Sequence, residues 1–190
     1  DVEIDQATGI AYLGGAFFTV GSSSRKNLAG VDLAGSGTVT STSIALTGVN
    51  PNTTATSVST LELDGSGNLY IGGNFQVSPE KDNPAVIAKL ALATNTVSTV
   101  VPYYETPRSL ARTPKTGTSG ALSLVVAGGS LFVGGDFSDY GTAARSGLAA
   151  YDLTSGALRN DFNPSPDGMV MVVRASANAQ AVFVGGEFDN

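Results

Sequence analysis

The chain has 190 residues, including 24 glycines, with 42% hydrophobic and 14% charged residues. This is long enough for one sizeable core, and its richness in small residues, Thr, Ser and Val favours an all-β fold. A net charge of −6 disfavours nucleic acid as a partner, and the absence of Cys and His excludes disulfides, thiolate zinc sites and the usual general base.

Residues 1–54 make a first predicted unit, in which short apolar strands alternate with Gly- and Ser-rich turns. The turns are expected at 21–24 and 35–37. The strands are expected at residues 2–4, 12–17, 28–33 and 38–40. The unit ends in a loop where Asn52 begins a glycosylation acceptor triplet, a pattern that is common by chance.

Residues 55–105 make a second predicted unit with the same order of elements. The strands are expected at residues 58–63, 70–75, 86–90 and 96–98. The turn at 64–68 carries oxygen-bearing side chains at alternate positions, as calcium loops do, but no glutamate follows at the spacing that closes an EF-hand site. A hairpin turn is the favoured interpretation, so neither a metal nor a cofactor is expected.

A third predicted unit covers residues 119–168, after an insertion at 103–118. Its strands are expected at residues 122–126, 132–137 and 148–153. A partial fourth unit covers 169–190 and includes a strand at 183–188. We interpret residues 1–190 as a single repeat domain that belongs to a longer assembly. No run of residues is apolar and long enough to predict a membrane span in this segment.

The strongest signal is a hexapeptide of the form aromatic-aliphatic-Gly-Gly-x-Phe. Its four copies begin at Tyr12, Tyr70, Phe132 and Phe183. The first glycines recur at intervals of 58, 62 and 51 residues, and a period of about this size is typical of propellers and solenoids. A second shared element has an alanine 15 or 16 residues after the first glycine, so the length changes fall elsewhere.

Glycine weakens a strand interior, so each pair is expected where backbones approach closely or a bulge bends the strand. The aromatic residue before each pair and the Phe after it are expected to fill the space between adjacent sheets. Four short strands per unit predict tandem four-stranded antiparallel repeats, a partial β-propeller of about three and a half blades. Further chain or further copies would complete such a propeller.

These units resemble the repeats of bacterial secreted and cell-surface proteins with tandem β-propeller-type repeats, which read Gly-Gly-Asp-Phe, then Arg-x-x-Leu-Ala-Ala-aromatic-Asp. Residues 130–190 match this pattern best. The second unit departs from it at Pro84 and Lys89 and lacks the Asp, so its outer strands are expected to be irregular. The resemblance implies the fold and an extracellular location, but no ligand, because the group is functionally heterogeneous.

The insertion is the main candidate for ligand binding, because loops on a rigid scaffold often carry recognition and Tyr with Arg is rich in contacts. The residues concerned are Tyr103, Tyr104, Arg108 and Arg112. The alternative is a solvated connection of variable length. Acidic residues after the glycine pairs form a second candidate, as a carboxylate pair for glycoside cleavage or as solvated acids at the rim. They are Asp136, Asp139, Glu187 and Asp189.

Together these observations favour a non-enzymatic extracellular scaffold, binding or adhesion module. Its expected partner is a protein or glycan surface, or further copies of itself. Two alternatives stay open: a structural subunit of a cell-surface layer or extracellular filament, and a carbohydrate-active hydrolase or lyase that uses Asp, Glu and Tyr.

Overall fold

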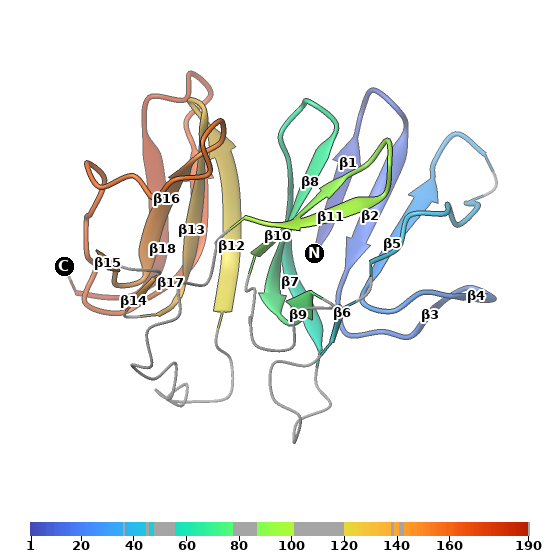
Figure 1. Ribbon diagram of the computed structural model, residues 1–190, viewed down its shortest axis with the longest axis horizontal. Helices are drawn as coiled ribbons and strands as arrows, with labels where there is room; N and C mark the ends of the chain where they lie inside the picture. The colour runs from blue at the N-terminus through green and yellow to red at the C-terminus, as the bar shows by residue number, and fades with distance from the viewer. Residues whose placement is uncertain are drawn as a thin grey trace. The chain divides into compact units, whose positions relative to one another are not determined.

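The structure is a computed structural model. It describes residues 1–35, 37–44, 46–47, 56–77, 87–100, 120–137, 139–140 and 143–189. Within these ranges the regular structure consists of β strands, and the strands pair antiparallel (Figure 1). The all-β prediction is therefore confirmed. The chain divides into two compact units, Asp1–Thr99 and Val100–Asn190, and each is described by itself.

The first unit contains two main sheets (Figure 1). One has the order β1-β2-β5, with β1 at Val2–Asp5, β2 at Ile10–Gly14 and β5 at Leu28–Asp32. The other has the order β11-β10-β8-β7, with β7 at Ser57–Leu63, β8 at Asn68–Asn74, β10 at Ile87–Ala91 and β11 at Thr96–Thr99. Two short pairs join β3 (Thr19–Val20) to β4 (Ser23–Ser24) and β6 (Leu46–Thr47) to β9 (Gln76–Val77).

The second unit also contains two main sheets (Figure 1). One has the order β12-β13-β16, with β12 at Gly120–Ala127, β13 at Ser130–Asp136 and β16 at Leu148–Asp152. The other pairs β17 (Met169–Ala175) with β18 (Val182–Glu187). A short ladder joins β14 (Asp139–Tyr140) to β15 (Ala143–Ala144).

The glycine pairs lie opposite a β-bulge in three of these sheets. The two glycines of each pair face strand residues that are two positions apart, so one residue of the facing strand is left over. The facing pairs are Val58 and Thr60 for Gly73 and Gly72, Ala121 and Ser123 for Gly135 and Gly134, and Val170 and Val172 for Gly186 and Gly185. A Cβ at Gly73 would collide with the carbonyl oxygen of Ser57, which explains why the position needs glycine.

The first glycine of a pair makes room for the next sheet along the chain. In the first unit β7 packs on β1 and β2, and the side chains of Val58 and Leu61 occupy the space where a Cβ of Gly14 would lie. In the second unit β17 packs on β12 and β13 in the same way, with Val170 and Val173 over Gly134. These contacts form the centre of the hydrophobic core in each unit.

A hydrogen bond accompanies each of these contacts. β7 and β17 are edge strands, so some of their N–H groups have no partner strand. The N–H of Leu61 donates to Oδ2 of Asp1 at 2.8 Å, and the N–H of Val173 donates to Oγ of Ser123 at 3.0 Å. In both units, therefore, a side-chain oxygen of the preceding sheet satisfies an edge N–H that the contact buries.

The outer strands of the second predicted unit are regular, so the expectation of irregularity there is wrong. β10 pairs along its whole length with β8, and four of its residues pair with β11. Lys89 does not disturb the strand, because its ammonium group lies over the ring of its cross-strand neighbour Tyr70, 5.7 Å from the ring centroid. Pro84 lies outside the described residues.

The short fourth strand expected at 38–40 is reduced to one bridge, between Val31 and Val39. The sheet of β16 ends in the same way, with one bridge between Tyr151 and Leu158. Near the first bridge the N–H of Thr42 donates to Oγ1 of Thr40 at 3.3 Å. Such local side-chain bonds compete with a ladder, which accounts for the early end of this strand.

The aromatic residues of the repeated hexapeptide, which were predicted to fill the core, differ in burial from copy to copy. Tyr12 and Phe132, which precede their glycine pairs, are buried, whereas Phe137, which follows its pair, is half-buried. Phe17 and Phe188 are also half-buried. Phe75, which follows the glycine pair of β8, is by contrast fully buried in the core cluster of the first unit, and Phe188 packs against the core cluster of the second unit.

Replacement of Gly14 by alanine is expected to destabilise the first unit. The new Cβ would lie 2.5 Å from Cγ1 of Val58 and 3.1 Å from Cγ of Leu61. Overpacking of this kind costs about 1–3 kcal/mol of unfolding free energy. Gly35→Ala is the control, because its Cβ would meet only Oδ2 of Asp32, at 3.7 Å. Denaturant unfolding followed by circular dichroism measures both, and equal stabilities would contradict close packing over Gly14.

Candidate functional site

The residues that the sequence predicts to bind a ligand lie outside the described residues. They are Tyr103, Tyr104, Arg108 and Arg112, together with the rest of the insertion and Asn52. The structure therefore leaves that prediction as it stands. Three other arrangements of polar or aromatic side chains lie within the described ranges: the turn at Asp64, an acidic depression near β18, and an aromatic groove beside β13.

The turn after β7 uses the carboxylate of Asp64 within the hairpin itself. Oδ1 accepts hydrogen bonds from the N–H groups of Ser66 and Asn68, at 2.8 and 3.1 Å. Oδ2 accepts a hydrogen bond from Nδ2 of Asn68 at 2.6 Å. Both oxygens therefore hold the turn between β7 and β8, as expected for a hairpin turn.

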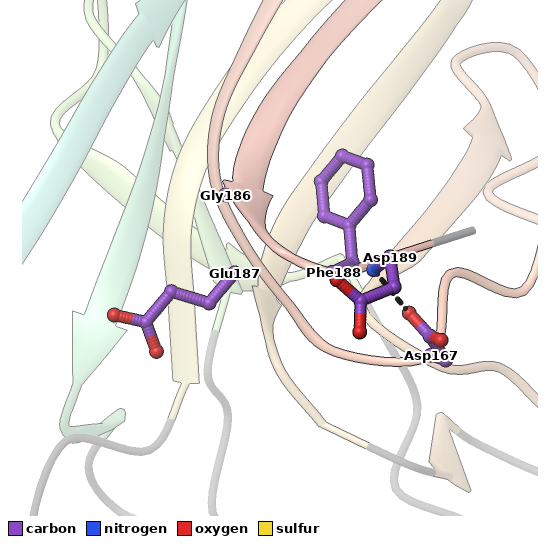
Figure 2. A pocket seen from close by; sticks show the side chains of 5 residues that line it. All are labelled: Asp167, Gly186, Glu187, Phe188 and Asp189. Carbon is purple, nitrogen blue, oxygen red and sulfur yellow. Dashed lines mark hydrogen bonds between the residues drawn. The ribbon is translucent and has the colours of Figure 1, made fainter.

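An acidic depression lies at the end of β18 (Figure 2). Its volume is about 480 Å³, and its lining consists of Asp167, Gly186, Glu187, Phe188 and Asp189. The backbone N–H of Asp189 donates to Oδ1 of Asp167 at 2.8 Å, which ties the segment after β18 to the segment before β17. Figure 2 shows the side chain of Glu187 extending away from those of Phe188 and Asp189.

This geometry bears on the proposed carboxylate pairs. The structure brings Asp189 beside Asp167, a neighbour that the sequence analysis did not single out, while Glu187 points elsewhere. Asp136 ends β13 and is half-buried, and Asp139 belongs to the separate ladder of β14 and β15. Within the described ranges, no three acidic side chains are grouped as a metal site requires.

Three carboxyl groups have a lowered pKa, and hydrogen bonding is the main cause in each. For Asp152 the donors are the N–H and hydroxyl of Ser155, at 2.7 and 2.8 Å. The pKa of Asp161 is lowered by its hydrogen bond from Arg159, and that of Asp5 by a hydrogen bond from Thr8. A general acid in glycoside cleavage needs the opposite shift, so these three groups are suited to holding turns.

An aromatic groove of about 390 Å³ lies between the β13 and β17–β18 hairpins of the second unit. The rings of Phe132 and Phe162 meet edge to face within it, with centroids 5.1 Å apart. Arg159 lies at its rim, where Nη1 donates to Oγ of Ser130 at 2.9 Å and Nη2 forms an ion pair with Asp161 at 2.6 Å. The guanidinium is held in place, and an apolar ring could lie against the aromatic edges.

This groove was not predicted from the sequence. Neither Phe162 nor Arg159 was among the predicted site residues. The signal that was available is the segment Arg159-Asn160-Asp161-Phe162 directly after the bridge at Leu158, in the unit that matches the pattern best. Only the fold places it beside Phe132, from a strand 30 residues earlier in the chain.

Comparison of the chain with models of protein families and with curated proteins found no match in either case. Over the described ranges, no helical segment has the length and apolar character needed to cross a membrane.

Substitution of Asp64 by alanine is expected to lower the unfolding free energy by about 1–2 kcal/mol, because the turn loses a carboxylate that accepts three hydrogen bonds. Asp64→Asn should cost less, since one acceptor oxygen remains. Ser66→Ala is the control, because the turn uses the backbone N–H of Ser66. Denaturant unfolding tests the order, and an Asp64→Ala variant as stable as the parent would contradict it.

Removal of divalent metal is expected to leave the melting temperature unchanged, because the oxygens of Asp64 are already engaged within the turn. Thermal unfolding with and without a strong chelator measures the effect. A melting temperature that falls by several degrees after chelation and recovers with added calcium would contradict this expectation and show that a bound metal stabilises the chain.

Proposed function

We propose that this chain is a non-enzymatic binding or adhesion module, secreted or on the cell surface, and that its sheets are blades of a partial β-propeller. The observation that carries the proposal is the repeated contact between sheets, in which the first strand of one sheet packs over the first glycine of the preceding sheet. This contact recurs with the same register in both units.

The sequence period and the strand order support the propeller part of the proposal. Each complete sheet runs antiparallel in chain order, and its second strand carries the first glycine of the pair. Blades of propellers have about four such strands and pack face to face around an axis. The sheets here have two to four strands, with single bridges in place of a fourth strand in two of them.

Buried polar side chains in the described ranges hold the scaffold together, which supports a non-enzymatic role. Nδ2 of Asn27 donates to the carbonyl oxygens of Gly15 and Thr56, at 2.9 and 2.7 Å, and so links the first sheet to the start of the next. Arg145 is buried, and its Nη2 donates to the carbonyl oxygen of Arg159 at 3.3 Å.

In the first sheet Arg25, the arginine of the repeated pattern, binds a backbone carbonyl group in the same way. Nη2 of Arg25 donates to the carbonyl oxygen of Thr40 at 2.6 Å. Thr40 and Arg159 each follow the bridge residue at the outer edge of their sheet. We infer that the arginine of the Arg-x-x-Leu-Ala pattern holds this outer segment against its sheet by a hydrogen bond. The charged residue thus has a structural role.

Recognition is assigned in this proposal to the insertion at 103–118. A rigid arrangement of sheets leaves its connecting segments free to vary, and Tyr and Arg are the residues most enriched where proteins bind partners. The proposed partner is a protein or glycan surface, which Tyr103, Tyr104, Arg108 and Arg112 would contact.

Tyr104→Ala and Arg108→Ala are expected to weaken binding to a partner surface by about tenfold, equivalent to about 1.4 kcal/mol, while the melting temperature stays nearly unchanged. Deletion of residues 106–115 should abolish binding. Binding of fluorescent protein to glycan arrays and to bacterial or host cell surfaces identifies the partner and measures the loss.

Phe132→Ala is the contrasting variant, since it removes a buried ring and should cost about 3–5 kcal/mol of stability. Binding that survives the deletion would contradict the assignment to the insertion. A Tyr104→Ala variant as unstable as Phe132→Ala would show that the tyrosine belongs to the core. Turnover of a bound glycan by the parent protein would contradict the non-enzymatic part of the proposal.

A further inference from the structure

We draw no further inference here: the strongest candidate, the aromatic groove between β13 and the β17–β18 hairpin of the second unit, is lined in part by the final hairpin of the sequence, and nothing in the structure shows what covers it.

Discussion

The structure depends on close contact at the first glycine of two of the pairs, Gly14 and Gly134. A strand residue with a side chain would hold the next sheet away, whereas Gly14 and Gly134 let pairs of aliphatic side chains reach the backbone. Dispersion attraction and burial then act over a short distance, and the aromatic residue two positions earlier closes the contact from one side. Each sheet alone would leave one apolar face in water, so the contact between sheets is what makes each unit stable.

The bulge opposite the glycine pair is linked to this contact. The second glycine accommodates the close approach of a facing carbonyl group, as at Gly73 and Ser57, and the extra residue changes which side chains face the preceding sheet. The edge strand must also satisfy an N–H group at the buried contact. Asp1 accepts this N–H in one unit and Ser123 accepts it in the other. Different residues can do so because each has a short side chain with an accepting oxygen.

The same constraint connects the scaffold to the functional proposals. Charged residues that attract attention in the sequence, such as Arg25, Arg145 and Asp64, are used to hold edges and turns. In the proposed function, recognition belongs to the insertion at 103–118 and not to these residues.

The sequence by itself determined the main strands and their antiparallel order, because these follow from local turn chemistry. It left open whether a bulge or a close approach of backbones explains each glycine pair, and the structure shows a bulge opposite three of the four pairs. The tertiary structure decided which aromatic positions are buried: Phe132 and Phe137 belong to one hexapeptide, yet only Phe132 lies under the next sheet. It also decided that Lys89 is accommodated over Tyr70, that Phe162 meets Phe132, and that Phe183 is uncovered. Burial depends on which distant part of the chain packs over a residue, and a local sequence pattern does not contain that information.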